Sequence, residues 1–130
     1  MNNFEYAIPE SIDKALEYLE TKDARLKAGG IDLLDQMKEG LIDPKRLISI
    51  REMADLKFIK KEKNGGLHIG PALTLTEIAE SKEMSGGFKV LAQAAGAVAS
   101  PQVRNAATLA GNLCQRPRCW YFRSSDFPCA

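Results

Sequence analysis

The sequence contains little of what many catalytic proteins need. Its 130 residues include one histidine and one tryptophan, and aromatic residues make up only 7%. A lone histidine, His68, leaves no second one to share acid–base work. We place it in a hairpin strand, where a solvent-facing partner role is the simpler interpretation. Neither a Ser–His–Asp arrangement nor a pair of carboxylates at a useful spacing is evident. The sequence therefore predicts no general acid or base.

An excess of charge and a long apolar run are also missing. Lys and Arg number 18 against 17 Asp and Glu, and this balance argues against a surface built for nucleic acid or anionic lipid. No apolar run approaches the ~20 residues that cross a bilayer. Residues 1–10 lack the basic patch and apolar stretch of a signal peptide. We therefore expect no nucleic-acid or membrane partner and a cytoplasmic location.

Cysteine is scarce and confined to the end of the chain, at Cys114, Cys119 and Cys129. The spacing contains no Cys-x-x-Cys pair of the kind that zinc sites use. In a reducing cytoplasm we expect no disulfide. The arginines between these cysteines could stabilise thiolates or an anionic iron–sulfur cluster. Buried, inert thiols are the alternative.

The first part of the chain alternates between strand and helix patterns. Ser11 is a predicted N-cap, and apolar residues follow it at helical spacing. Gly40 ends the second helical pattern. The predicted order is strand, helix, strand, helix, strand, over residues 4–8, 12–19, 25–28, 32–38 and 46–50. This order is typical of a small α/β unit.

The pattern changes after residue 56. A hairpin is predicted over residues 58–70 with its turn at Asn64–Gly65–Gly66. Thr74 and Glu77 form a capping box that opens a short helix to about Glu83. A second helix is predicted over residues 88–99, ended by Ser100 and Pro101. Residues 101–113 show no long period, which predicts an extended segment with tight turns.

Two glycine-containing stretches could face a ligand. Gly29–Gly30 follows a strand and precedes a helix, and a bare helix N-terminus is a natural phosphate site. The alternative is a turn that needs positive φ. In the second stretch, Thr108 and Asn112 could donate to phosphate or ribityl oxygens, and Gly111 permits close approach. Here the alternative is a turn-rich segment whose polar groups satisfy one another.

These stretches, taken together, resemble the FAD-binding subunit of the molybdenum hydroxylase family, which includes xanthine dehydrogenase and carbon monoxide dehydrogenase. The resemblance covers nearly the whole chain. It is carried by residues 27–34 (KAGGIDLL), residues 67–72 (LHIGPA) with TLTE after them, and residues 102–113 (QVRNAATLAGNL). The last of these is the most specific.

The resemblance implies an α+β, vanillyl-alcohol-oxidase-like (PCMH-type) fold. Residues 1–55 would form one α/β FAD-binding subdomain, and residues 56–130 would begin a second, incomplete one. Ile31 stands where the family often has Thr, and Ala110 where it often has Gly. The implied FAD-binding residues are Lys27, Ala28, Gly29, Gly30, Ile31, Asp32 and Leu33 at the pyrophosphate, with Thr108, Gly111 and Asn112 at the phosphates and the flavin end.

The cysteine region resembles the inserted loop of 4-hydroxybenzoyl-CoA reductase and some aldehyde oxidoreductases. In those proteins the loop binds an extra [4Fe–4S] cluster. Cys119 and Cys129 match its first two ligand positions, and two further ligands would lie downstream. Cys114 does not match a ligand position.

The resemblance also implies a function. The chain would belong to an oxidoreductase subunit that passes electrons from iron–sulfur clusters through FAD to an external acceptor. Its partners would be a molybdenum-cofactor subunit and a [2Fe–2S] subunit. The family's subunit is longer than this chain, which predicts an N-terminal piece that is inactive alone and binds FAD weakly or not at all. An iron–sulfur or metal-binding module and a cofactor-free α/β docking domain remain as alternatives.

Overall fold

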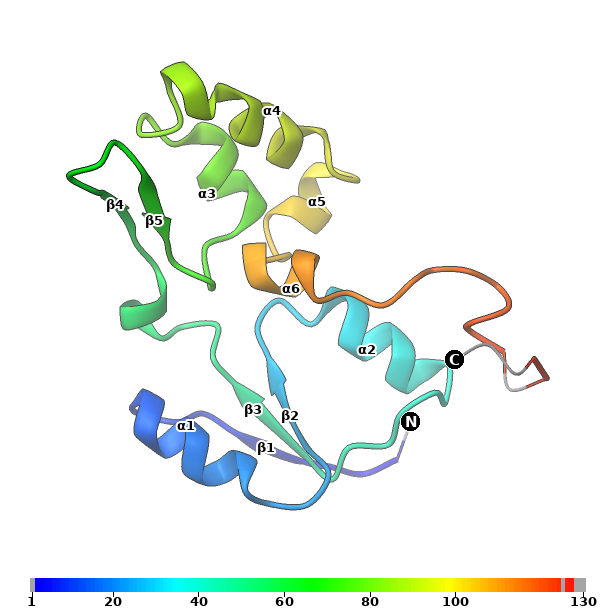
Figure 1. Cartoon of the computed structure of the whole chain (residues 1–130). Coiled ribbons are helices and arrows are strands. Elements are labelled where there is room, and N and C mark those ends of the chain that lie inside the picture. The colour runs from blue at the N-terminus through cyan, green and yellow to red at the C-terminus, as the bar shows by residue number, and fades with distance from the viewer. Residues whose placement is uncertain (1, 125, 128–130) are drawn as a thin grey trace.

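A computed structural model describes residues 2–124, 126 and 127 (Figure 1). It combines a parallel sheet, a hairpin and several short helices. In chain order the elements are β1 (Glu5–Ala7), α1 (Ile12–Leu19), β2 (Ala24–Lys27), α2 (Ile31–Lys38), β3 (Arg46–Ser49), the 3-10 helix η1 (Ala54–Leu56), β4 (Ile59–Lys61), β5 (Leu67–Ile69), α3 (Leu75–Glu80), the 3-10 helix η2 (Gly86–Phe88), α4 (Lys89–Ala97), α5 (Pro101–Arg104) and α6 (Leu109–Leu113).

The first three strands form a parallel sheet in the order β1-β3-β2. Leu47 of the central strand pairs with Tyr6 on one side and Arg25 on the other. Helix α1 covers the sheet. Its N-cap is Ser11, and the Ser11 hydroxyl accepts a hydrogen bond from the Lys14 backbone amide at 3.1 Å. Figure 1 draws α1 and α2 on opposite sides of the sheet. The predicted strand and helix order is confirmed, with each boundary within about two residues.

The predicted hairpin and capping box are also present. β4 and β5 pair antiparallel around a turn in which the Asn64 side chain accepts from the Gly66 amide at 2.8 Å. At α3, the Thr74 hydroxyl accepts from the Glu77 amide, and the Glu77 carboxylate accepts from the Thr74 amide at 2.7 Å. This helix ends at Glu80 rather than near Glu83.

The prediction of an extended segment over residues 101–113 is wrong. The segment holds two short helices, α5 and α6. Ser100 caps α5 and Pro101 opens it, so this pair starts a helix as well as following the end of α4. Thr108 caps α6. Helices this short have no measurable apolar period, so only their caps mark them in the sequence.

Two separate hydrophobic clusters stabilise the chain. One joins α1 to the sheet through Ala15, Ala24 and Ile48. The other lies between α3 and α4 around Leu75, Ile78 and Ala95. They share no residue, which supports a division of the chain near residue 55, although the predicted subdomain boundary itself stays a prediction. Within the described residues, no helix is both long and apolar enough to cross a membrane.

Candidate functional site

All ten predicted FAD-binding residues line one pocket of about 560 Å³. On one side lie the end of β2, the loop that follows it and the start of α2. On the other lie residues of the segment that runs from the end of α4 to Arg118. Further lining residues, which were not predicted to bind FAD, are Arg25, Leu26, Gln36, Ile42, Val98, Ala99, Val103, Ala107, Cys114, Gln115, Arg116 and Arg118.

The start of α2 supplies backbone amides to this pocket. Gly30 is the N-cap, with φ +81°, and no side chain caps the helix. The first paired amide is that of Leu34, which donates to the Gly30 carbonyl at 2.9 Å. No acceptor among the described residues pairs with the amides of Ile31, Asp32 and Leu33. Gly30 therefore meets both interpretations of the turn: it needs positive φ, and it leaves free donors at a helix N-terminus.

Gly29 serves a different purpose. A Cβ on this residue would overlap the carbonyl oxygen of Ala106 and lie 2.8 Å from the carbonyl carbon. The missing side chain thus lets the β2–α2 loop rest directly on the backbone before α6. Sequence reasoning assigned this freedom to an approaching ligand, but here the approaching group is another part of the chain.

The polar groups around α6 are mostly used within the fold. Thr108 is only 1% exposed, and its hydroxyl accepts from the Gly111 amide at 3.3 Å. The backbone amide of Asn112 donates to the Thr108 carbonyl at 2.8 Å. Nearby, the Thr76 hydroxyl donates to the Asn105 side chain at 2.6 Å. The side chains of Thr108 and Asn105 thus have partners within the fold, as in the alternative interpretation, but none of these bonds involves the Asn112 side chain. Direct contacts of Thr108, Gly111 and Asn112 with a cofactor stay a prediction.

The charged side chains that line the pocket are mainly cationic. Arg25, Lys27, Arg116 and Arg118 stand against one lining carboxylate, Asp32. Arg118 also pairs with Asp35 outside the pocket, at 3.0 Å. Free amides and an excess of cations together suit an anionic group such as a pyrophosphate.

Arg104 lies within residues 102–113 and helps to shape the pocket, a role that the sequence did not indicate. Its Nη1 donates to the carbonyls of Val98 and Ala99, at 2.8 and 3.0 Å. Ala99 has φ +42°, a left-handed conformation that costs a non-glycine residue about 1–2 kcal/mol. Both residues line the pocket, so Arg104 holds a strained stretch of its wall in place.

Comparisons with known proteins agree with this geometry. The model of a family described as the FAD binding domain in molybdopterin dehydrogenase matches residues 2–130. The chain belongs to this family. It is 39% identical over 117 residues to the aldehyde oxidoreductase FAD-binding subunit PaoB of Escherichia coli (strain K12). These residues make up 90% of this chain and 36% of that protein. The nicotinate dehydrogenase FAD-subunit of Eubacterium barkeri is 34% identical, over 87% of this chain and 39% of the relative.

Solved structures of the same family share the fold. Carbon monoxide dehydrogenase from Hydrogenophaga pseudoflava aligns with a TM-score of 0.80 and 34% identity, over 86% of this chain and 39% of the other. Quinoline 2-oxidoreductase from Pseudomonas putida 86 aligns with a TM-score of 0.81 and 29% identity, with the same coverages. The predicted family and PCMH-type FAD-binding fold are confirmed. The chain spans 36–39% of the length of these four proteins.

The cysteines of this chain form no metal site in the part that the structure describes. Cys114 and Cys119 are exposed free thiols. Cys129 lies outside the described residues. No three His, Cys, Asp or Glu side chains gather around a metal position within the described ranges. The assignment of Cys119 and Cys129 as cluster ligands therefore stays a prediction.

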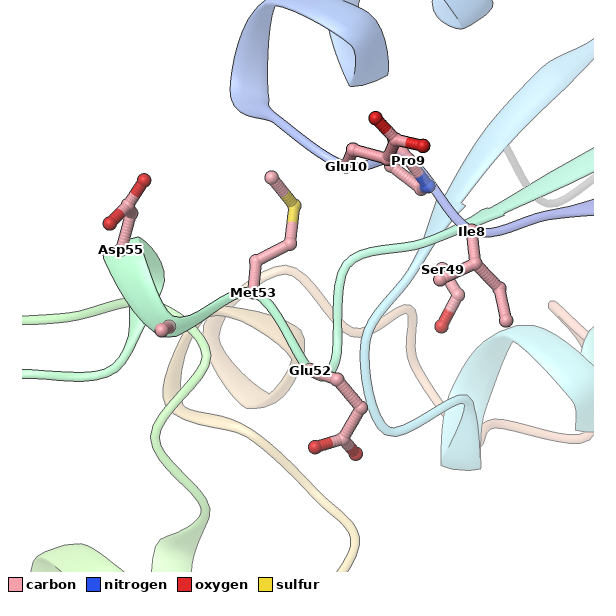
Figure 2. Close-up of a pocket in the computed structure, with 8 residues that line it drawn as sticks. Ile8, Pro9, Glu10, Ser49, Glu52, Met53 and Asp55 are labelled. Atoms are coloured by element: carbon pink, nitrogen blue, oxygen red, sulfur yellow. The ribbon is translucent and has the colours of Figure 1, made fainter.

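A smaller pocket, of about 220 Å³, lies beyond the carboxyl ends of β1 and β3 (Figure 2). Three carboxylates line it, from Glu10, Glu52 and Asp55. Figure 2 shows them pointing in different directions, and Glu52 pairs with Arg51 and Lys57. They do not converge on a common point, so this pocket offers no binding chemistry comparable to the larger one.

Proposed function

We propose that this chain is part of the FAD-binding electron-transfer subunit of a molybdenum-dependent hydroxylase or dehydrogenase. The observation that carries the proposal is the cationic pocket at the uncapped N-terminus of α2. When bound, FAD would supply the redox chemistry, taking electrons from iron–sulfur clusters and passing them to an external acceptor. No side chain of the pocket needs to act as an acid or base in that role.

The pocket residues fit the most highly charged part of FAD, its pyrophosphate. The free amides of Ile31, Asp32 and Leu33 can donate to phosphate oxygens, and the positive end of the α2 dipole favours negative charge there. Lys27 and Arg25 add positive charge to the lining of the same pocket. This chain's own part is thus to bind and orient the cofactor.

The names of the relatives support a place in a larger assembly. They include a carbon monoxide dehydrogenase medium chain and a subunit of a 6-hydroxypseudooxynicotine dehydrogenase complex. We propose a molybdenum-cofactor subunit and a [2Fe–2S] subunit as the partners of this protein. The cytoplasmic location, and the weak or absent binding of FAD by the 130-residue chain, stay predictions from the sequence.

ADP is a suitable probe because it carries a pyrophosphate group like that of FAD and needs only this pocket. Isothermal titration of the wild-type chain should show saturable binding that weakens with added salt. Lys27→Gln should raise the Kd about fivefold, since it removes one charge that lines the pocket. Lys63→Gln, in the exposed hairpin, is the matched control and should leave the Kd unchanged. The absence of saturable ADP binding to the wild-type chain would contradict the proposal.

A further inference from the structure

One wall of the FAD pocket has no regular secondary structure. Residues 114–118, here called the pocket strap, follow α6 and contribute Cys114, Gln115, Arg116 and Arg118 to the lining. No ladder of helix or sheet hydrogen bonds holds the strap against α2. Its position must therefore depend on particular side-chain contacts.

Arg123 supplies such contacts. Its side chain is 8% exposed. Nη2 donates to the Asp32 carboxylate at 2.7 Å, and Nη1 donates to the Glu39 carboxylate at 2.8 Å. Nε donates to the Pro117 carbonyl at 3.1 Å, within the strap itself. One planar guanidinium thus joins the first turn of α2, the residue after its last turn, and the strap.

Asp32 closes this network. Its other carboxylate oxygen accepts from the Arg116 backbone amide at 3.0 Å and from the Gln36 side chain at 2.6 Å. The Asp32 side chain is 15% exposed, so most of its charge is shielded from water. Because it lines a pocket suited to anions, its charge would repel a phosphate if Arg123 did not offset it.

We propose that Arg123 is a positioning residue that holds the pocket strap against α2 and offsets the Asp32 charge. The strap then forms the second wall of the ligand pocket. The ligand part of this inference rests on the proposed function. The attachment of the strap does not, because it concerns contacts within the chain alone: those of Arg123, the bond from the Arg116 amide to Asp32 and the pair of Arg118 with Asp35.

The test compares Arg123→Gln with Arg51→Gln in the 130-residue chain. Arg51 pairs with Glu52 at 3.4 Å on the surface and does not line the pocket, so it is a matched control. Trypsin cleavage after Arg118 reports on the strap, since Pro117 protects the bond after Arg116. Trp120 is the only tryptophan and is 89% exposed next to the strap, so its fluorescence anisotropy reports on local motion.

We expect Arg123→Gln to be cleaved after Arg118 at least about tenfold faster, with lower Trp120 anisotropy and an ADP Kd about tenfold higher. Far-UV circular dichroism should stay that of the wild type. Arg51→Gln should match the wild type in every measurement. Arg123→Lys should recover part of the ADP affinity through its charge, but not the slow cleavage, because an ammonium cannot reproduce the three-way contact.

Each contrary result has a distinct meaning. Equal cleavage rates in the wild type and Arg123→Gln would overturn the attachment. Faster cleavage with an unchanged ADP Kd would overturn the role of the strap as a pocket wall. If the wild-type chain binds no ADP, the proposed function fails, and cleavage still decides the attachment. If Arg123→Gln does not fold, Glu39→Gln replaces it: faster cleavage supports the attachment, and wild-type cleavage overturns it.

Discussion

The β2–α2 loop and the segment around α6 contain similar residues but use them differently. The loop over residues 28–30 leads into α2, whose first amides stay free because Gly30 caps the helix without a side chain. Around α6, Thr108 caps the helix and the neighbouring polar groups pair among themselves. Both stretches line the same pocket. In the proposed function, one presents donors to a ligand, and the other forms the support on which those donors rest.

This difference shows how a binding site can divide its work. Free donors bind an anion well only if their backbone stays in place. The support is itself attached to the rest of the fold: the Leu75 amide donates to the Ala107 carbonyl at 2.9 Å, and the Leu109 amide donates to the Leu73 carbonyl at 2.8 Å. Changes in the support should therefore alter stability, and changes in the loop should alter affinity.

The largest effect is expected where the two stretches touch. Gly29→Ala places a methyl group against the Ala106 carbonyl, which is backbone and cannot turn aside as the end of a flexible side chain can. The free energy of unfolding in urea should fall by about 3 kcal/mol or more, and ADP binding should be lost with it. In Gly87→Ala the added methyl group meets nothing within 4 Å, so this control should stay within about 0.5 kcal/mol of the wild type. Similar small losses in both variants would contradict the contact.

A smaller loss is expected at Thr108. Thr108→Val keeps the side-chain shape but removes the oxygen that caps α6. The free energy of unfolding should fall by about 1–2 kcal/mol, while the ADP Kd changes less than about twofold. Ser11→Ala removes the corresponding cap of α1 and is the control for a loss of stability away from the pocket. A Thr108→Val variant of normal stability and much weaker ADP binding would instead support direct ligand contact.

Acid should weaken α3, the helix to which this support is attached, through Glu77. Partial burial pushes the pKa of Glu77 up, but hydrogen bonds from the Thr74 amide and hydroxyl outweigh it, so the pKa lies below its usual value. The folded state therefore favours the carboxylate, and this contribution is present above about pH 4.3 and is lost as the pH falls below it.

Thermal unfolding between pH 3 and pH 7 tests this contribution. Glu77→Gln should show a smaller drop in Tm in acid than the wild type. The effect should be below about 1 kcal/mol, because the side chain is exposed to water. Glu80→Gln, on the same helix and with no hydrogen bond to its cap, is the control. Identical pH profiles for wild type and Glu77→Gln would refute the expected role of the capping box.

The smallest effect is expected at the start of α2, directly after the loop. Ile31→Thr adds a hydroxyl donor beside the free amides of α2, so the ADP Kd should fall about two- to fivefold. The free energy of unfolding should change by less than about 1 kcal/mol. Ile8→Thr, at an exposed position outside the larger pocket, should leave the Kd unchanged. Loss of stability without a gain in affinity would weaken the distinction between loop and support.

Much of the fold follows from local signals in the sequence. Ser11, Thr74 and Glu77 mark helix starts through hydrogen bonds within four residues of sequence, and the Asn64 turn is equally local. The ten predicted FAD-binding residues all line one pocket. They could be selected from the sequence because the family resemblance carries spatial information that residue spacing alone does not contain. The helices α5 and α6 were missed because each is too short to show an amphipathic period.

By itself, the sequence determined the order of strands and helices, the helix caps and the two glycine-containing stretches, since all of these depend on neighbouring residues. Only the tertiary structure decided that Gly29 contacts Ala106 and that Arg123 reaches Asp32, 91 residues away. Such contacts depend on how whole helices and strands pack. Residues so far apart in the sequence show no local pattern that predicts their contact. Packing therefore leaves the amides at the start of α2 free for the proposed ligand, while it uses the polar groups around α6 as structural support.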